Sequence, residues 1–286
     1  MKLCLGTAQF GLDYGINNPH GKISQENILE ILTLAHDNGI VMLDTASAYG
    51  NSESVLGESI LQTGQDFQII TKYPVNTDVR PVQWIDTSLK QLRKDKIYGY
   101  LFHNYSIYQK HPDYINDFTR IKEAGKSEKT GFSLYFPYEA EYILRNNIPC
   151  DIVQIPYNIF DQRFAPILPE LKSRGIEIHV RSIFLQGLFF IDPEKLDIHF
   201  NSIKSLLIEL HQTAENNSIS ITALCLAFAY NNQEISYIVV GIDSLDNLKD
   251  IIGVYSLLGK LYFYNDFFAK FTINDEKIIL PFNWQT

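Results

Sequence analysis

Four polar residues stand directly after short apolar runs, at the points where buried strands would end. Asp44 and Tyr49 follow residues 39–43, Lys72 follows 67–71, and His103 follows 97–102. If parallel strands carry them, their carboxyl ends bring the four side chains to one mouth. A carboxylate, a phenol, an ammonium and an imidazole at one place can move protons. The ammonium favours the phenolate, the carboxylate holds the ammonium, and the imidazole donates to a substrate oxygen.

Each of these residues also has a structural interpretation by itself. An Asp before Thr at a strand end often caps a helix, and a Tyr in a loop usually packs. A Lys at a strand end is usually solvated, and a His there is often a hydrogen-bonded structural residue. Taken singly, these structural interpretations are favoured. Three consecutive strands that all end in such residues favour the catalytic interpretation, which depends on the four side chains meeting in space.

Short apolar runs alternate with amphipathic stretches along the whole chain. We predict strands over residues 3–6, 41–44, 68–72, 98–103, 129–133, 151–156, 177–181 and 237–241. We predict helices over residues 24–38, 52–61, 79–93, 112–124, 137–145, 165–173, 201–216 and 245–258. Eight such units predict an α/β fold, a (β/α)₈ TIM barrel that occupies residues 1–286 as a single domain. No GxGxxG motif follows the first strand, which argues against a Rossmann fold.

Three segments add to this pattern. Residues 185–198 form a long loop after the seventh strand, and residues 220–231 form an extra helix before the eighth. Long loops at the carboxyl face of a barrel are usually functional. The C-terminal stretch 260–286 is predicted to pack on the barrel because it is rich in aromatic residues: Tyr262, Phe263, Tyr264, Phe267, Phe268, Phe271, Phe282 and Trp284.

Composition excludes several classes of function. The 286 residues carry a net charge of −9 with a pI near 5.3, and 45 % are apolar. A nucleic-acid-binding protein would more commonly be basic. The three cysteines form no CxxC pair, so neither a disulfide framework nor a zinc site is indicated. The sequence shows no signal peptide and no apolar run of about twenty residues. We therefore expect a cytoplasmic protein, monomeric or weakly dimeric, with no membrane or nucleic-acid partner.

Six motifs in order resemble one protein family. The string Leu43-Asp44-Thr45-Ala46-Ser47-Ala48-Tyr49-Gly50-Asn51-Ser52-Glu53 resembles the Asp-Thr-Ala…Tyr-Gly…Glu signature of the aldo-keto reductases. The other five are Leu5-Gly6-Thr7-Ala8-Gln9-Phe10-Gly11, Thr71-Lys72, Leu101-Phe102-His103, Gly131-Phe132-Ser133 and Val153-Gln154-Ile155-Pro156-Tyr157-Asn158. The resemblance covers nearly the whole chain, and it implies an oxidoreductase that transfers hydride between a nicotinamide cofactor and a carbonyl or alcohol.

The resemblance also implies roles that the physics of the residues supports. Tyr49 would be the general acid in reduction and the base in oxidation. Lys72 would lower the pKa of Tyr49 from its ordinary value of about 10. Asp44 would hold Lys72 through a charge-assisted bond, and His103 would orient the substrate oxygen. No metal is needed.

By resemblance, the cofactor would contact residues from several strand ends. Ser133 and Gln154 would bond the nicotinamide carboxamide, although Leu134 stands where the family often has Asn. Arg181 stands where many members stack an aromatic ring under the nicotinamide. We expect this Arg to lower affinity for the oxidised cofactor, unless it turns toward an anionic substrate or a carboxylate. The remaining expected contacts are Gly6 and Thr7 at the first strand, Ser182, Phe184 and Gln186 at the pyrophosphate, and Gly241, Asp243 and Asn247 at the adenosine end.

The cofactor and the substrate stay open between alternatives. Gly241 and Asn247 stand where many members use Lys and Arg for the 2′-phosphate, yet other branches of the family bind NADPH with a Gly there. We keep NADP(H) ahead of NAD(H) by a narrow margin. Residues just past strand ends mix aromatic and amide side chains, which suits a sugar-like substrate: Gln9, Phe10, Tyr14, Tyr73, Asn104, Tyr105, Tyr135 and Tyr157.

Two other functions compete with carbonyl reduction. One is a cofactor-binding regulatory or subunit protein of the same family without significant turnover, which Arg181 and Leu134 favour and the intact quartet argues against. The other is an isomerase or aldolase on the same architecture. That function would need a Gly-rich phosphate loop after strands seven and eight, and Gly187 and Gly241 alone do not supply one.

Overall fold

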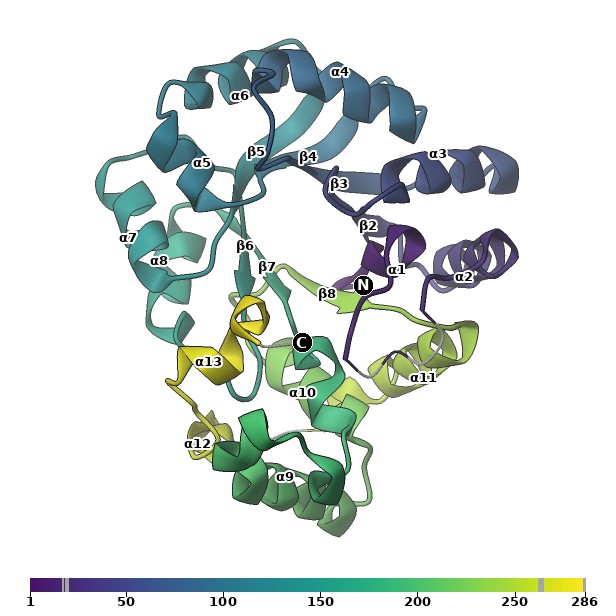
Figure 1. The fold of residues 1–286 in the computed structure, drawn as a ribbon, viewed down its shortest axis with the longest axis vertical. Coiled ribbons are helices and arrows are strands. Elements are labelled where there is room, and N and C mark those ends of the chain that lie inside the picture. The colour runs from purple at the N-terminus through teal and green to yellow at the C-terminus, as the bar shows by residue number, and fades with distance from the viewer. Residues whose placement is uncertain (17, 19–20, 262–264, 285–286) are drawn as a thin grey trace.

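Eight parallel strands close into a barrel in which β8 pairs with β1. A computed structural model describes residues 1–16, 18, 21–261 and 265–284, and within these ranges the strand order around the barrel is β1 to β8. The strands are β1 (Leu3–Gly6), β2 (Met42–Asp44), β3 (Gln68–Tyr73), β4 (Ile97–Phe102), β5 (Ser127–Ser133), β6 (Ile152–Pro156), β7 (Glu177–Arg181) and β8 (Tyr237–Gly241). Figure 1 shows them at the centre with helices around them. The predicted (β/α)₈ fold is confirmed.

The helices alternate with these strands and cover the outside of the barrel. They are α1 (Ala8–Gly11), α2 (Gln25–Asp37), α3 (Ser52–Thr63), α4 (Pro81–Leu92), α5 (Tyr105–Lys110), α6 (Tyr114–Glu123), α7 (Pro137–Arg145), α8 (Leu168–Ser173), α9 (Lys204–Asn216), α10 (Ile221–Tyr230), α11 (Leu245–Tyr255), α12 (Asn265–Ala269) and α13 (Glu276–Ile279). The extra helix predicted before the eighth strand is α10. Within the described part of the chain, no helix is long and apolar enough to cross a membrane.

Two segments between the predicted elements contain short helical turns. Sequence analysis placed no helix between His103 and residue 112, but α5 forms there because the Asn104 side chain accepts a hydrogen bond from the Ser106 N–H and caps the helix. The long loop predicted at 185–198 contains 3₁₀ turns over Leu185–Phe190 and Pro193–Lys195.

Side chains from alternating strand positions fill the barrel interior. One buried cluster consists of Cys4, Met42, Ile70, Leu101, Ile152 and Val239, whereas their strand neighbours Leu5, Leu43 and Ile69 belong to the larger core shared with the helices. The alternation follows from the two-residue period of a strand. Where β5 meets β6, a Cβ on Gly131 would lie 1.8 Å from the Ile152 carbonyl oxygen. The close approach requires glycine two residues before Ser133.

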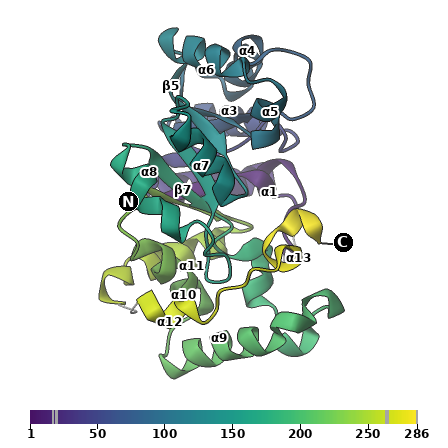
Figure 2. The same cartoon turned by 90° about the vertical axis from the view of Figure 1, so that its left-hand side faces the viewer.

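The C-terminal segment packs on the barrel, as its aromatic composition predicted. Phe268 and Phe271 are buried, and Trp284 is buried with its indole N–H donating to the Ile278 carbonyl at 2.9 Å. Phe282 meets Tyr135 edge to face, with ring centroids 5.1 Å apart. In Figure 2, α13 and the short helix α1 lie on the same side of the barrel, which is the side of the strand carboxyl ends. Tyr262, Phe263 and Tyr264 lie outside the described residues.

Candidate active site

Asp44 and Lys72 form a buried ion pair at the carboxyl ends of β2 and β3. Lys72 Nζ donates to Asp44 Oδ1 at 2.6 Å and to the Thr45 carbonyl at 2.9 Å. The side chains are only 1 % and 4 % exposed, respectively. An unpaired charge buried this deeply would be very costly, so each residue requires the other. This pair is the arrangement that the sequence predicted.

Tyr49 and His103 lie next to this pair. Lys72 Nζ is 5.3 Å from the centroid of the Tyr49 ring. The Tyr49 and His103 rings meet edge to face, with centroids 5.7 Å apart and planes at 85°. The structure therefore brings together a phenol, an imidazole, an ammonium and a carboxylate from three stretches of chain, at and after the end of β2, at the end of β3 and after β4.

The pKa of Tyr49 differs from the sequence-based expectation. Burial, followed by the negative charge of Asp44, raises the pKa of Tyr49 well above its ordinary value, and the charge of Arg181 offsets this only in part. We expected Lys72 to lower the pKa. Because Asp44 lies 2.6 Å from the Lys72 ammonium, it neutralises much of the field that the phenol would feel. Tyr49 is consequently a protonated phenol over the physiological range, which is the form that donates a proton.

His103 is neutral in this environment. Burial, together with the positive charges of Lys72 and Arg181, lowers the pKa of His103 to about 3. Its Nδ1 atom is buried and has no hydrogen-bond partner among the described residues. A neutral imidazole carries one N–H, so His103 can donate one hydrogen bond to a substrate oxygen.

A second layer of polar residues holds the strand ends beneath the quartet. Glu53 Oε1 accepts from Thr71 Oγ1 at 2.6 Å, which fixes the residue before Lys72. The Thr7 hydroxyl donates to the Asp44 carbonyl at 3.1 Å and lies 3.0 Å from Ser52 Oγ. Sequence analysis assigned Thr7 to the cofactor, but its hydroxyl is engaged below the strand ends and it does not line the cavity.

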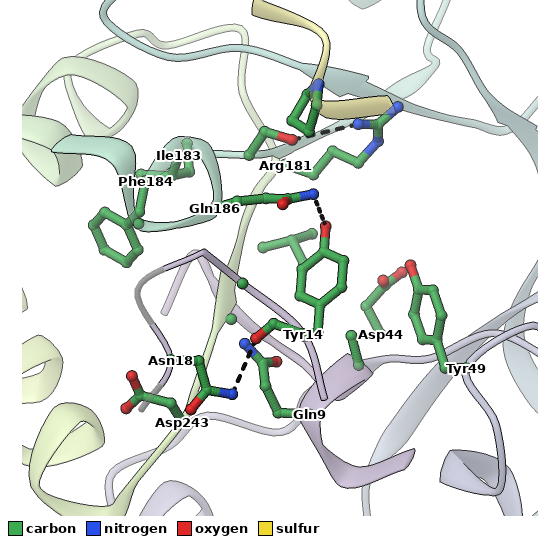
Figure 3. A pocket seen from close by; sticks show the side chains of 18 of the residues that line it. Gln9, Tyr14, Asn18, Asp44, Tyr49, Arg181, Ile183, Phe184, Gln186 and Asp243 are labelled. Carbon is green, nitrogen blue, oxygen red and sulfur yellow. Dashed lines mark hydrogen bonds between the residues drawn. The ribbon is translucent and has the colours of Figure 1, made fainter. Parts of the chain in front are cut away.

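A cavity of about 700 Å³ opens above the quartet and extends across the mouth toward β8. Figure 3 shows side chains from several loops converging on it. The lining residues are Gly6, Ala8, Gln9, Tyr14, Gly15, Asn18, Asp44, Tyr49, His103, Ser133, Tyr135, Gln154, Arg181, Ser182, Ile183, Phe184, Gln186, Gly187, Phe190, Thr222, Val239, Gly241, Asp243, Asn247, Asp250, Pro281 and Phe282. Lys72 is buried behind this surface.

The structure brings the other expected cofactor residues to this cavity. Gly6, Ser133, Gln154, Arg181, Ser182, Phe184, Gln186, Gly241, Asp243 and Asn247 all line it. Gln154 has a second contact that the sequence did not indicate, because its Nε2 donates to Asp44 Oδ2 at 2.7 Å. At the β8 end, the Ser244 hydroxyl donates to Asp243 Oδ1 and accepts from the Asn247 N–H, so Ser244 caps helix α11.

Arg181 turns toward the end of β5. Its Nη2 donates to the Leu134 carbonyl at 3.0 Å, and its guanidinium carbon lies 4.3 Å from the centroid of the Tyr135 ring. Figure 3 shows the Arg181 side chain directed away from Gln9 and Asp243. The guanidinium thus stacks on a tyrosine of the cavity wall.

Two loops meet above the cavity. Gln186 Nε2 donates to the Tyr14 hydroxyl at 3.0 Å, and the Gln186 carbonyl accepts from the Ile16 N–H at 3.1 Å. Positive φ angles recur in the loop after β7, at Ser182 (61°), Leu185 (45°), Gln186 (53°) and Gly187 (93°). Such angles are costly for residues other than glycine and concentrate at functional sites. The contact between the two loops makes a bridge across the cavity.

Several lining residues were not among the predicted cofactor contacts. Thr222 and Asp250 come from helices α10 and α11, and the Thr222 hydroxyl donates to Asp250 Oδ2 at 3.0 Å. Asn18, Phe190 and Phe282 come from loops and from the C-terminal segment. The aromatic composition of the segment was the one signal that pointed to Phe282. A search confined to strand ends could not find Thr222 or Asp250.

The predicted substrate-wall residues divide into two groups. Gln9, Tyr14 and Tyr135 line the cavity, whereas the other five lie elsewhere. Phe10 is buried in the core, Asn104 caps α5, and Tyr105 is the buried first residue of that helix. The Tyr73 hydroxyl donates to the Val79 carbonyl, and the Tyr157 hydroxyl accepts from Asn232.

The chain is similar to several known proteins. An "aldo-keto reductase YhdN" of Bacillus subtilis is 28 % identical over 191 residues, which span 59 % of this chain and 55 % of that protein. An "L-galactose dehydrogenase" of Arabidopsis thaliana is 26 % identical over 262 residues, which span 84 % of this chain and 82 % of that protein. The chain therefore spans about half the length of the first relative and most of the second.

Solved structures share the fold at low sequence identity. The holo form of an aldo-keto reductase AKR11C1 from Bacillus halodurans aligns with a TM-score of 0.75 at 18 % identity, over 94 % of this chain and 90 % of that one. A glycerol dehydrogenase AKR11B4 from Gluconobacter oxydans aligns with a TM-score of 0.74 at 20 % identity, over 94 % and 89 %. A family model described as "Aldo/keto reductase family" matches residues 2–264, nearly the whole sequence. The chain therefore belongs to the aldo/keto reductase family.

Proposed function

We propose that this protein transfers hydride between a nicotinamide dinucleotide and a small carbonyl or alcohol substrate, with Tyr49 as the general acid and base. The observation that carries the proposal is that Tyr49, His103 and Asp44 line one cavity, while Lys72 lies behind this surface, paired with Asp44 and 5.3 Å from the centroid of the Tyr49 ring. Membership of a family of oxidoreductases agrees with it.

The cavity has features that suit a dinucleotide. Ser133 and Gln154 offer a hydroxyl and an amide at its catalytic end. Gln9 is 8 % exposed, and its Oε1 is buried without a hydrogen-bond partner in the described part of the chain. Its amide nitrogen lies 3.3 Å from where a Cβ on Gly241 would be, so glycine keeps this wall open. When bound, the cofactor supplies or accepts the hydride.

The residues of the quartet can perform the accompanying proton transfer. In reduction, the Tyr49 hydroxyl gives its proton to the substrate oxygen and becomes a phenolate. The charge of Arg181 favours that phenolate, and so does the Lys72 ammonium near the Tyr49 ring, although Asp44 holds Lys72 and neutralises much of its field. The neutral His103 donates to the same substrate oxygen and fixes its position. Alcohol oxidation uses the same groups in reverse.

The residues at the far end of the cavity favour NAD(H) as the cofactor, whereas sequence analysis ranked NADP(H) narrowly ahead of NAD(H). Asp243 and Asp250 line this end, and among the described lining residues neither a Lys nor an Arg lies with them. Carboxylates repel a 2′-phosphate and accept hydrogen bonds from ribose hydroxyls. We therefore propose NAD(H) as the preferred cofactor.

A polyol or sugar-like substrate is consistent with the catalytic end. Its walls include the rings of Tyr14, Tyr135 and Phe282, which can pack on the carbon skeleton of a sugar while polar groups bond its hydroxyls. Two similar proteins carry names of this kind, a galactose dehydrogenase and a glycerol dehydrogenase. The aromatic walls and the names of the two similar proteins together support a polyol or sugar-like substrate.

Cofactor binding and turnover test the proposal together. Titration of the protein with NADH and NADPH should quench its intrinsic fluorescence, and an aldehyde panel should oxidise the bound reduced cofactor. Binding without any turnover would favour the alternative, a cofactor-binding regulatory or subunit protein. If neither dinucleotide binds at millimolar concentration, both functions are wrong.

A further inference from the structure

Arg181 carries a positive charge at the catalytic end of the cavity and forms no ion pair with a described carboxylate. The Glu139 carboxylate, which accepts hydrogen bonds from the Tyr135 and Phe136 N–H groups, is within electrostatic reach but does not contact the guanidinium. Its polar contacts are a bond to the Leu134 carbonyl at 3.0 Å and one to Ser182 Oγ at 3.4 Å, both neutral acceptors. The ring of Tyr135 covers one face of the guanidinium at 4.3 Å. A guanidinium has five N–H donors in a planar fork, so these two bonds leave the other donors open. A planar or multidentate anion is the matching acceptor.

Apart from Asp44, positive and negative side chains lie at opposite ends of the cavity. Among the described lining residues, Arg181 is the only Lys or Arg. Asp44 is already engaged on both oxygens, by Lys72 and by Gln154. Asp243 and Asp250 lie at the β8 end, and Figure 3 shows Asp243 far across the cavity from Arg181. The Arg181 end therefore attracts anions, whereas the β8 end repels them.

Arg181 is close to the groups that handle the substrate oxygen. The positive charge of Arg181 lowers the pKa of Tyr49, against the effect of burial, which raises it. The same charge lowers the pKa of His103, in the same direction as burial. The effect of the Arg181 charge on both residues indicates that the guanidinium is within electrostatic reach of the two side chains. The guanidinium lies against the Tyr135 ring, and the Phe282 ring meets Tyr135 with centroids 5.1 Å apart. A substrate held at Tyr49 would thus meet Arg181 and these two rings.

We propose that Arg181 binds an anionic oxygen group of the substrate, a carboxylate or a phosphate ester, so that the preferred substrates are acidic carbonyl compounds or the corresponding alcohols. This inference rests on the proposed function and names its substrate class. The aromatic walls pack on the carbon skeleton, the guanidinium fork holds the anion, and Tyr49 meets the carbonyl.

Matched pairs of substrates test this specificity. The pairs are 4-carboxybenzaldehyde against benzaldehyde for a carboxylate, and glyceraldehyde 3-phosphate against glyceraldehyde for a phosphate. We expect kcat/KM to favour the charged member of at least one pair by tenfold or more, about 1.4 kcal/mol. Arg181→Leu should abolish that preference, and Arg181→Lys should restore part of it, since a point charge lacks the fork. Arg174→Leu is the control, because this Arg precedes β7 at the opposite end of the barrel and its side chain is 50 % exposed.

Binding measurements separate this inference from the proposed function. Calorimetric titrations with benzoate, phenyl phosphate and benzamide should show an anion binding at least tenfold more tightly than the amide, in wild type and Arg174→Leu but not in Arg181→Leu. Such a result without any carbonyl reduction would remove the proposed function and leave the Arg181 site. Equal binding of anion and amide by wild type overturns the inference. So does an Arg181→Leu variant that loses dinucleotide affinity tenfold while its substrate preference is unchanged, because the charge then serves the pyrophosphate.

Discussion

Gln154 Nε2 donates to Asp44 Oδ2 at 2.7 Å, while Asp44 Oδ1 accepts from Lys72 at 2.6 Å. One carboxylate therefore connects an amide of the cavity wall to the ammonium behind Tyr49. The bond to Gln154 fixes the Asp44 carboxylate, and the carboxylate in turn fixes Lys72. Two charge-assisted hydrogen bonds thus link the cavity wall on β6 to the Lys72 ammonium, which lies 5.3 Å from the centroid of the Tyr49 ring.

This connection predicts the effect of Gln154→Leu. The variant leaves one buried carboxylate oxygen without its donor, so we expect the free energy of unfolding to fall by about 2 kcal/mol and kcat to fall about tenfold. Gln91→Leu removes an exposed amide on α4 and serves as the control. Urea denaturation and steady-state kinetics would measure the two effects. Wild-type kcat in Gln154→Leu would show that the bond to Asp44 does not matter for turnover.

Tyr49→Phe removes the proposed proton donor with little change of shape. We expect kcat to fall by at least about 100-fold, the usual contribution of a positioned acid or base, while cofactor affinity stays within a few-fold. Tyr138→Phe is the matched control because Tyr138 is 53 % exposed. Stopped-flow reduction and fluorescence titration give the two readings, and undiminished turnover in Tyr49→Phe would mean that another group is the acid.

Several strand ends of this barrel were predictable because an apolar run stops at a polar residue, as at Asp44, Lys72 and His103, or at a glycine, as at Gly6 and Gly241. The predicted bounds of β1, β7 and β8 agree with the structure, and the resemblance gave the members of the quartet. The short helix α5 was missed, since six residues are too few for a clear helical period and its start depends on one cap, Asn104.

Burial and long-range contacts were the parts that the sequence could not give. The direction of the Tyr49 pKa depends on how deeply the phenol is buried and on the neutralisation of Lys72 by Asp44, both of which are properties of the folded chain. The orientation of Arg181 depends on Tyr135, 46 positions earlier in the sequence. Asp250 is a helix residue with no local sign of a role, yet it lines the cavity because α11 follows β8.

The neutral state of His103 predicts the shape of the pH profile. Its pKa is lowered to about 3, so the imidazole is unprotonated at every pH above that value. The rate of carbonyl reduction should therefore show no fall with a midpoint near 6.5, the ordinary pKa of a free His. His103→Gln, which keeps a donor, should lower kcat without changing the pH profile between pH 5 and 8. A fall in the wild-type rate with a midpoint near 6.5 that is absent from His103→Gln would show that His103 titrates in this range.

The carboxylates of the β8 end predict cofactor preference. We expect NADH to bind at least tenfold more tightly than NADPH, and the double variant Asp243→Asn, Asp250→Asn to narrow this ratio at least tenfold by removing repulsion of a 2′-phosphate. Asp246→Asn is the control, because Asp246 lies on α11 as Asp250 does, is 89 % exposed and pairs with Lys249. Fluorescence titrations with both dinucleotides would measure the ratio, and an unchanged ratio in the double variant would place the 2′ position elsewhere.

Glu177, at the amino-terminal end of β7, predicts a pH-dependent contribution to stability. Burial alone would raise its pKa, but bonds from His179, Lys129 and Tyr98 outweigh burial and lower the pKa to about 2. A lowered carboxyl pKa stabilises the fold fully above the unfolded value of 4.5, and the contribution is lost as pH falls from there toward 2.

Glu177→Gln should therefore lower the free energy of unfolding by about 2 kcal/mol at pH 7 and by clearly less at pH 3, as measured by urea denaturation. Glu128→Gln, in an exposed pair with Lys96, should cost less than about 0.5 kcal/mol at both values. A cost of Glu177→Gln that is equal at pH 7 and pH 3 would show that the ionised carboxylate is not what stabilises this end of the barrel.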